Sequence, residues 1–340
     1  MRADSTRRDH LSLLRKLVIV RYLLAGMALW LCASSAASAA EEMRAVVFTD
    51  GHFQVQSVPR PEPQAGQVRV RVRAASINPV DWKQAERAAP GTRLIPGRDM
   101  SGVIDAVGDA AGPWKVGQAV MAIATGGGSY AEYALASTKA LALKPQRLSF
   151  EEAAGIPVAG ETAWRALVTI ANVQRGQRVL IQGGAGGVGS LAVQIAKARC
   201  AYVIATASPN HDELLRALGA DEIVDYHKVR FEEKLRNIDV VFNTVNADIG
   251  ARSITVLKPG GILVSVTGSA PAAQCEAAKT RCSVTGFVTG EMLPALSALA
   301  EEGKLHVHID RQFPLTEAVQ ALELNRQGHT GGKIILEVSR

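Results

Sequence analysis

The part of the sequence with the clearest chemical pattern is the glycine-rich segment "VLIQGGAGGVGSLAVQIAKA", residues 179–198. Gly184, Gly186 and Gly189 match the pattern G-x-G-x-x-G between an apolar run and an amphipathic segment. Such glycines permit a tight turn, close approach of the backbone to a pyrophosphate, and close packing of the next helix on the strand. The helix N-terminus adds free N–H groups and a positive dipole end. A flexible glycine turn would share the pattern, but its position between a strand and a helix predicts a dinucleotide site.

The next predicted strand indicates which dinucleotide binds. It ends in "IATASPN" without the Asp or Glu that usually contacts the 2′-hydroxyl of NAD. Its polar side chains, Thr206, Ser208 and Asn210, are small hydroxyl and amide donors that accommodate a 2′-phosphate, so we predict NADPH. Tyr226, at the end of the following strand, either adds a phenol donor or packs with its hydroxyl in solvent. The loop after the second strand offers only His211, which weakens the preference for NADPH.

The elements around this segment fall into two parts. Residues 43–157 alternate short β-like runs with Gly- and Pro-rich turns, as an all-β unit does. Residues 160–290 alternate apolar strand-like runs with helical patterns, which predicts an α/β fold with a parallel sheet. We place the domains at residues 41–158, completed by 306–340, and at residues 159–305.

Charge limits the possible partners. The chain has 38 Lys and Arg and 32 Asp and Glu, but six of the basic and two of the acidic residues lie within residues 1–40. The remainder is nearly neutral and has no basic stripe interleaved with aromatic residues, so nucleic acid is not an expected partner.

Residues 1–40 have the plan of a cleavable export signal. A basic region precedes an apolar run at residues 22–32 and the small-residue stretch "ASSAASAA". The run is too short for a membrane span, so we expect none in the mature chain. The segment "TRRDHL" resembles a twin-arginine signal, and an ordinary Sec signal fits equally. We predict export to the periplasm; translation from Met43 would instead give a cytoplasmic protein.

The four cysteines do not form a zinc cluster. Cys275 and Cys282 lie seven positions apart and either form a disulfide or remain free thiols. Cys200, at the end of a predicted helix, is expected to be a small buried residue.

Several stretches together resemble one family. They are "MRAVVF", "AASINPVDWK", "IPGRDMSGVI", "GGGSYAEYALA", "LSFEEAAGIPVAGETAW", "GGAGGVGSLAVQIAKA", "LGADEIVDY", "VLKPGGILVSVTG" and "GGKIILEV". The chain resembles the medium-chain dehydrogenase/reductase superfamily, in its zinc-independent quinone oxidoreductase (zeta-crystallin-like) branch. The resemblance implies a GroES-like β domain, a Rossmann domain with a doubly wound parallel sheet, and an active site in the cleft between them. It also implies NADPH, hydride transfer to quinones or to the activated C=C bonds of enones and enals, and homodimers.

The zinc-dependent members of that superfamily carry Cys and His-Glu where this chain has Asn78 and Arg98-Asp99. A catalytic zinc needs about three protein ligands. We therefore expect no metal, and a substrate activated by conjugation needs less help from a Lewis acid.

The resemblance also assigns roles to single residues. Asn78, Tyr130 and Thr162 match positions at the nicotinamide and substrate end; their alternatives are a turn residue, a core tyrosine and a helix-start residue. Asp81 and Lys83 either orient the cleft or pair on the surface. The cofactor contacts that the glycine pattern and the resemblance predict are Gly184, Gly186, Gly187, Val188, Gly189, Ser208, Tyr226, Thr267, Gly268 and Lys333.

Two rival functions remain at this point. The chain could bind NADPH without turnover, as lens crystallins recruited from this family do. A zinc-type alcohol dehydrogenase is the third hypothesis, and it would require bound metal.

Overall fold

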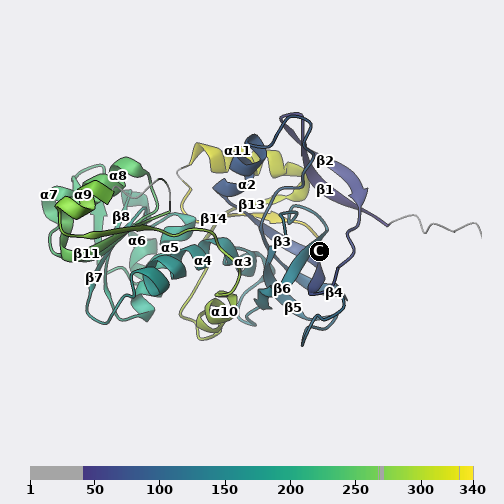
Figure 1. Cartoon of the computed structure of the whole chain (residues 1–340), viewed down its shortest axis with the longest axis horizontal. Coiled ribbons are helices and arrows are strands. Elements are labelled where there is room, and N and C mark those ends of the chain that lie inside the picture. Colours follow the sequence, from purple (N-terminus) through teal and green to yellow (C-terminus); the bar gives the residue numbers. More distant parts are fainter. Residues whose placement is uncertain (1–40, 267, 269–271, 329, 340) are drawn as a thin grey trace, which may run out of the picture. The chain divides into compact units, whose positions relative to one another are not determined.

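The computed structural model describes residues 41–266, 268, 272–328 and 330–339 of the 340-residue chain. The chain divides into one unit of Met1–Glu41 and a second unit of Glu42–Arg340, most of which Figure 1 shows in colour. The predicted signal peptide, residues 1–40, and Thr267 lie outside the described residues.

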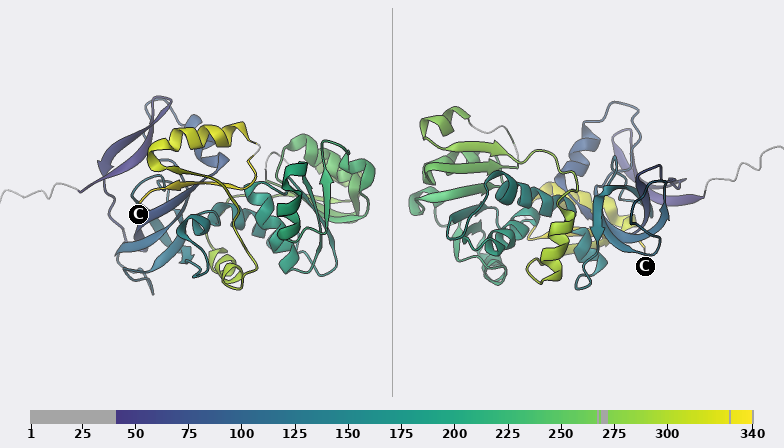
Figure 2. Two further views of the ribbon diagram at one scale, coloured as in Figure 1. Left: turned by 180° about the vertical axis from the view of Figure 1, so that it is seen from behind. Right: turned by 60° about the horizontal axis from the view of Figure 1, so that its bottom comes forward.

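A β domain opens the second unit. Its strands are β1 (Glu42–Thr49), β2 (His52–Pro59), β3 (Gln67–Ile77), β4 (Asp99–Val107), β5 (Ala119–Ala124), β6 (Tyr133–Leu143), β13 (Ile309–Pro314) and β14 (Lys333–Glu337). β1 and β2 form a hairpin, and the others form a sheet in the order β13-β14-β3-β4-β5-β6, in which β3 also pairs with β6. The chain returns to this domain at its end, because β14 pairs antiparallel with β3. Figures 1 and 2 show these last strands and α11, in yellow, beside the early strands.

The middle of the chain forms a parallel sheet. Its strands are β7 (Arg178–Gln182), β8 (Tyr202–Ala207), β9 (Glu222–Asp225), β10 (Ile238–Asn243), β11 (Leu257–Ser265) and β12 (Arg281–Val284). They lie in the order β12-β11-β10-β7-β8-β9, and every pairing is parallel. The sheet is therefore built outward from β7, first to one side and then to the other. This arrangement places a ligand crevice at the carboxyl ends of β7 and β10, where the direction of winding reverses. The predicted α/β class with a doubly wound sheet is confirmed.

Helices connect and cover the two sheets. The α-helices are α2 (Pro79–Glu86), α3 (Phe150–Ala154), α4 (Pro157–Trp164), α5 (Gly187–Ala198), α6 (Asp212–Ala217), α7 (Phe231–Lys234), α8 (Ala247–Ser253), α9 (Ala272–Ala277), α10 (Leu293–Glu301) and α11 (Ala318–Gln327). A π-helical segment, η1 (Arg165–Ile170), follows α4, and the 3-10 turns are η2 (Pro209–His211), η3 (Ile254–Val256) and η4 (Leu315–Glu317). The helix start predicted at Ser149 is confirmed: its hydroxyl accepts from the Glu152 N–H, and the Glu152 carboxylate accepts from the Ser149 N–H.

The central strands are buried on both faces because helices cover both faces. Val179, Leu180 and Ile181 of β7 have no exposed surface, and Leu191 of α5 packs in the same core as Val179 and Ile181. A continuous apolar strand of this kind is typical of a parallel sheet. Such burial holds the end of β7 and the start of α5 in fixed positions.

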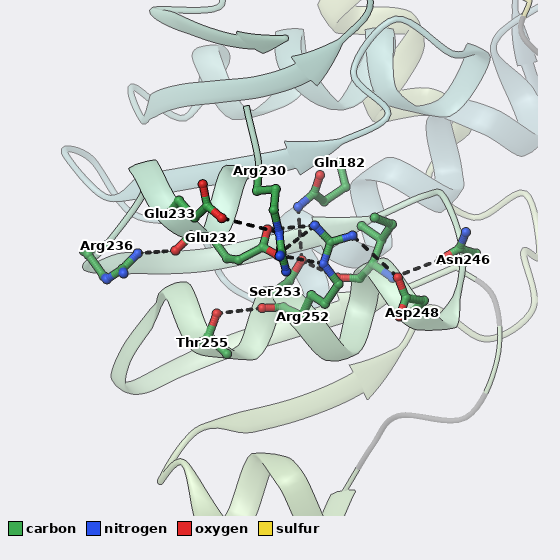
Figure 3. A network of polar contacts seen from close by, with 11 residues as sticks. Gln182, Arg230, Glu232, Glu233, Arg236, Asn246, Asp248, Arg252, Ser253 and Thr255 are labelled. Carbon is green, nitrogen blue, oxygen red and sulfur yellow. Dashed lines mark hydrogen bonds and ion pairs between the residues drawn. The ribbon is translucent and has the colours of Figure 1, made fainter. Parts of the chain in front are cut away.

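A polar network on the outer face of the parallel sheet links α7 and α8 to the end of β7 (Figure 3). The Arg252 guanidinium donates to both carboxylate oxygens of Glu232, at 2.9 Å each. The Gln182 amide, at the end of β7, donates to the Ser253 hydroxyl at 3.1 Å. The network therefore anchors the last residue of β7, directly before the glycine-rich turn.

The cysteines divide into one pair and one free thiol among the described residues. Cys275 of α9 and Cys282 of β12 form a disulfide with Cα atoms 6.0 Å apart, which resolves the two alternatives in favour of pairing. The prediction that Cys200 is buried is wrong: Cys200 is free and exposed. α5 ends at Ala198 with Arg199 as its C-cap, and Cys200 follows in the left-handed region with a φ of 59°, so it lies in an exposed turn beyond the helix.

No helix in the described part of the chain is long and apolar enough to cross a bilayer.

Candidate active site

A cleft of about 1380 Å³ runs between the β domain and the carboxyl ends of the parallel strands. One wall comes from α2, the loop before β4 and the start of β14; the other comes from α4, the turn after β7 and the segments after β10, β11 and β12. Of the predicted site residues, the cleft is lined by Asn78, Thr162, Gly186, Gly187, Val188, Gly268 and Lys333. The domain arrangement therefore joins residues that lie up to 255 positions apart.

The turn after β7 is fixed by hydrogen bonds to β8. The Gly183 N–H donates to the Thr206 hydroxyl at 3.0 Å, and the Gly184 N–H donates to the Thr206 carbonyl at 2.9 Å. The Thr206 hydroxyl itself donates to the Gln182 side chain at 2.8 Å. Thr206 is buried and committed to this turn, so the expectation that it faces a 2′-phosphate is wrong.

The three glycines of the pattern differ in whether the fold leaves room for a side chain at their positions. A Cβ at Gly189 would stand 2.1 Å from the Gly183 carbonyl oxygen, and one at Gly184 would stand 2.7 Å from the Ala205 Cβ. Both positions are therefore required for close packing of the turn, α5 and β8. A Cβ at Gly186 would meet only the Gly183 carbonyl oxygen, at an ordinary 3.5 Å. Packing within the fold therefore does not require a glycine at position 186, and the unfilled space beside Gly186 opens into the cleft.

The N-terminus of α5 points its first peptide groups at the same space. Gly186 is the N-cap, and Gly187 and Val188 begin the helix and line the cleft. N–H groups in a first helical turn have no acceptor within the helix. This combination of free donors, a positive dipole end and room for close approach suits a pyrophosphate. The residues present therefore fit a dinucleotide.

A buried polar cluster lies beside this turn, since a Cβ at Gly187 would stand 2.7 Å from Cδ of Lys333. The Lys333 ammonium donates to the Asn78 side-chain oxygen at 2.7 Å, and the Asn78 amide donates to Asp99 at 2.8 Å. Asp99 also accepts from the Val158 N–H at 2.7 Å and lies 3.7 Å from the Lys333 ammonium. Lys333 is 4% exposed and Asn78 is likewise buried, yet both line the cleft. The cluster fixes one ammonium and one amide at the surface of the cleft.

A second layer supports Asn78 from behind. Asp81 accepts from the Asn78 N–H at 2.8 Å and from the Tyr130 hydroxyl at 2.6 Å. Tyr130 is fully buried, and its ring packs where a side chain at Gly97 would otherwise lie. Tyr130 is absent from the cleft lining, so its geometry favours positioning of Asp81 and Asn78 over direct contact with substrate.

Burial shifts the pKa values of this cluster. Removal from water raises the pKa of Asp81 to about 7, although the hydrogen bonds from Tyr130 and Asn78 oppose the rise. The same cause raises the pKa of Asp99 and lowers that of Lys333, whereas the mutual attraction of those two groups opposes both shifts. The pKa of Tyr130 is raised by burial and by the carboxylate beside it.

Thr162 and Glu161 lie in α4, on the nicotinamide side of the predicted site. The Thr162 hydroxyl donates to the Val158 carbonyl at 2.7 Å, which leaves its lone pairs free for a donor in the cleft. Glu161 is fully buried and accepts from the N–H groups of Thr289 and Gly290 at 2.8 and 2.6 Å. It therefore holds the loop after β12, whose residues Thr285–Val288 line the cleft.

The predicted 2′-phosphate residues lie at the ends of β8 and β9. The Ser208 hydroxyl lies 3.0 Å from Nδ1 of His211, and Tyr226 is half exposed and stacked against His227 with ring centroids 4.4 Å apart. The structure thus brings Ser208 and His211 together and leaves the Tyr226 ring accessible. Gly268, with a φ of 82°, lines the cleft beyond β11, and Thr267 beside it lies outside the described residues.

Comparison with known proteins gives the chain its family. Residues 64–146 match the alcohol dehydrogenase GroES-like domain, and residues 218–336 match a family described as zinc-binding dehydrogenase. The chain is 37% identical over 336 residues to a 2-methylene-furan-3-one reductase of Solanum lycopersicum, with 89% of this chain and 84% of that protein covered. It is 35% identical to the chloroplastic NADPH-dependent alkenal/one oxidoreductase of Arabidopsis thaliana, with 88% and 81% covered.

Solved structures agree with these sequence relatives. The quinone oxidoreductase from Coxiella burnetii has a TM-score of 0.79 at 35% identity, with 88% of this chain and all of that chain covered. The chain belongs to the medium-chain dehydrogenase/reductase superfamily. Within it, the relatives at these levels of identity place the chain in the quinone oxidoreductase-like branch. The predicted pairing of a GroES-like domain with a Rossmann domain is therefore confirmed.

Several residues of this medium-chain reductase site could not be assigned from the sequence. The sequence marks Asp99 only as a replacement in the zinc motif, and no motif predicts a role for Glu161 or Phe287. A charged residue within an apolar run, as in "RDMSGVI" and "GGKIILEV", is a usable indication, because a buried charge must find a partner. In the described residues, no three His, Cys, Asp or Glu side chains gather in a way that could hold a metal ion.

Proposed function

We propose that this protein is an NADPH-dependent reductase that transfers hydride to a quinone or to the activated C=C bond of an enone or enal. The observation that carries the proposal is a cleft lined both by a phosphate-binding turn and by the Lys333–Asn78 pair beside it. The relatives named as alkenal/one and quinone oxidoreductases support the same reaction class.

NADPH would be held by the turn after β7 and by the ends of the parallel strands. Gly186, Gly187 and Val188 would receive the pyrophosphate, and Ser208 and Tyr226 would face the 2′-phosphate. When bound, the cofactor supplies the hydride. Proximity in a shaped cleft then accounts for much of the catalysis, since the chain offers a fixed site for both reactants.

The Lys333 ammonium, held by the Asn78 side-chain oxygen, would favour negative charge that develops on the substrate oxygen. The ammonium is held by a hydrogen bond and by burial, so it need not reorganise during the reaction. The Asn78 amide donates to Asp99 and to the Ser76 carbonyl, so Asn78 positions Lys333. Thr162 would accept a hydrogen bond from the cofactor's carboxamide across the cleft. Tyr130 and Asp81 would act through Asn78, by holding its backbone.

The reaction would not depend on zinc. The Asn78 oxygen already accepts from the Lys333 ammonium, and Arg98 lies in the same wall. A divalent cation there would meet two positive side chains instead of ligands. A zinc-type alcohol dehydrogenase is therefore the weaker hypothesis.

The test is consumption of NADPH by the purified protein with a panel of quinones, enones and enals, followed by the absorbance of the reduced nicotinamide. We expect turnover of at least one acceptor class and no loss of activity on chelation of metals. Tight NADPH binding without oxidation by any acceptor would favour the non-catalytic, crystallin-like alternative. Loss of activity on chelation would favour the zinc hypothesis.

We also propose that the protein is exported and that residues 1–40 are removed. The composition of that segment supports the proposal, and an exported protein would have to leave the cytoplasm with its cofactor. Mass spectrometry of the mature protein would find an N-terminus at Ala40 or Glu41. A terminus at Met43 or Arg44 would contradict export.

A homodimer is the proposed assembly. β12 is the edge strand of the parallel sheet and pairs on one side only within the described residues, which leaves a free edge for a second copy. Light scattering coupled to gel filtration would give a mass of two chains. A mass of one chain would contradict it.

A further inference from the structure

Positive charge is concentrated on one wall of the cleft. Lys83, Arg87 and Arg98 line it together with Lys333, and no Asp or Glu occurs among the described residues that line it. Lys333 is committed to Asn78 and Asp99, but the other three cations belong to no such cluster. Several cationic side chains without acidic ones give a concave site a positive electrostatic potential, which attracts anionic ligands.

Helix α2 presents part of this charge by its periodicity. Val80, Lys83, Gln84 and Arg87 line the cleft at spacings of three and four residues, so one face of the helix forms the wall. The opposite face buries Asp81 and Ala85. The burial of that face fixes the direction in which Lys83 and Arg87 extend.

No hydrogen bond or ion pair neutralises these three cations in the described part of the chain, although Arg98 attracts the neighbouring Asp99 carboxylate. The guanidinium groups of Arg87 and Arg98 make no hydrogen bond or ion pair there, and Lys83 only lies over the neighbouring Trp82 ring, at 5.2 Å. By contrast, Arg326 on the adjacent helix α11 pairs with Glu86 at 2.5 Å. On the side of the cleft, Lys83, Arg87 and Arg98 therefore have no ion pair of this kind.

The substrate side also carries apolar side chains. Val80 and Leu94 lie on the same wall as the cations, and Phe287 and Val288 line the cleft from the loop after β12. Phe287 is 87% exposed, although a phenyl ring usually packs against other side chains. An occupant that covers the ring and also meets the cations must have an apolar body and an acidic end.

We propose that Lys83, Arg87 and Arg98 form a subsite for a carboxylate on the substrate, so that the preferred acceptor is an enone or quinone with an acidic apolar tail. This inference rests on the proposed reductase function and names its substrate class. The three side chains belong to the β domain, whereas the cofactor's phosphates have donors of their own in the turn after β7 and at the ends of β8 and β9. The subsite therefore serves the substrate rather than NADPH.

The test compares a linear enone whose alkyl tail ends in a carboxylate with the methyl ester of the same compound. The variants Arg87→Gln and Arg98→Gln each remove one charge from the cleft. The matched control is Arg93→Gln: Arg93 lies in the same segment and is exposed, but it donates to Gln56 at 2.9 Å and does not line the cleft. The control changes the net charge equally, so it reports any long-range effect.

We expect the wild type to prefer the acid in kcat/KM by about tenfold or more, because a hydrogen bond between charged groups contributes about that much. Each cleft variant should reduce the ratio of acid to ester by about tenfold, and the control should leave it unchanged. Equal use of acid and ester by the wild type would overturn the subsite. So would an equal fall in the control, or a cleft variant that weakens NADPH binding and keeps the ratio.

Binding of both compounds to the NADP⁺ complex, which has no hydride to transfer, is measured by calorimetry and compared with their turnover with NADPH. This comparison separates the inference from the proposed function. If the acid binds tighter than the ester in the wild type but neither is reduced, the reductase function fails and the subsite is supported. If both are reduced and bound equally, the reductase function is supported and the subsite fails.

Discussion

Replacement of Gly186 by alanine separates cofactor approach from folding. The new Cβ would lie 3.5 Å from the Gly183 carbonyl oxygen, an ordinary van der Waals contact, and the residue has a φ of −70°, which alanine adopts freely. Alanine is a poorer N-cap than glycine, at a cost of ~0.5–1 kcal/mol. The smaller entropy of the unfolded chain offsets ~0.4–1 kcal/mol of that cost. The free energy of unfolding of the apoprotein should therefore change little.

NADPH affinity should respond differently to the same methyl group. The methyl would project into the space that a pyrophosphate occupies, and overpacking of a tight contact costs ~1–3 kcal/mol. Such a loss corresponds to a dissociation constant about 5- to 150-fold weaker. The assay is a fluorescence titration with NADPH, paired with thermal unfolding of the apoprotein.

Gly189→Ala is the matched comparison, because its Cβ would stand 2.1 Å from the Gly183 carbonyl oxygen. That variant should lower the stability of the apoprotein itself. The reasoning is refuted if Gly186→Ala binds NADPH within about twofold of the wild type, since no pyrophosphate would then pass over this position.

Three further predictions concern the buried cluster and the disulfide. Lys333→Met should destabilise the fold by ~3–5 kcal/mol in chemical denaturation, because it leaves the buried Asp99 without its cation; a change within ~0.5 kcal/mol would show that the pair is not a buried ion pair. The raised pKa of Asp81 means that the folded state holds its proton up to about pH 7, whereas the unfolded chain releases it near 3.8. The contribution of Asp81 to stability is thus full below pH 3.8 and is lost as pH rises to about 7, by up to ~4 kcal/mol relative to Asp81→Asn; a difference between the two proteins that does not vary with pH contradicts this shift. Reduction of the Cys275–Cys282 disulfide should lower the free energy of unfolding by ~2 kcal/mol, as measured with and without a dithiol; identical midpoints would contradict a stabilising role.

Local patterns were sufficient to predict the elements that carry the cofactor turn. The apolar run before Gly183 and the amphipathic segment after it form β7 and α5, because their burial depends on neighbours in sequence and on a parallel sheet. The close contact at Gly189 also follows from the pattern, since only a backbone without Cβ allows a helix so near the turn. These features are set within about 20 residues of chain, which is the length of such a unit.

The polar wall could not be predicted in the same way. Lys333 and Asn78 are 255 positions apart and meet because β14 pairs with β3, a long-range choice that no local pattern specifies. The buried orientation of the Thr206 hydroxyl depends on its hydrogen bond to the Gln182 side chain. The exposure of Cys200 depends on the positive φ of that residue. Residue type alone predicts that Thr206 contacts the 2′-phosphate and that Cys200 is buried. Both predictions are wrong because of these local interactions.

The central claim is that hydride passes from bound NADPH to a substrate in this cleft. The most direct measurement uses NADPH in which both hydrogens on C4 of the nicotinamide are replaced by deuterium, together with an enone acceptor and mass spectrometry of the product. The account predicts a saturated ketone with one deuterium at the β-carbon, formed in proportion to the NADPH consumed. Unlabelled product, or bound NADPH that persists while the enone is unchanged, would contradict it.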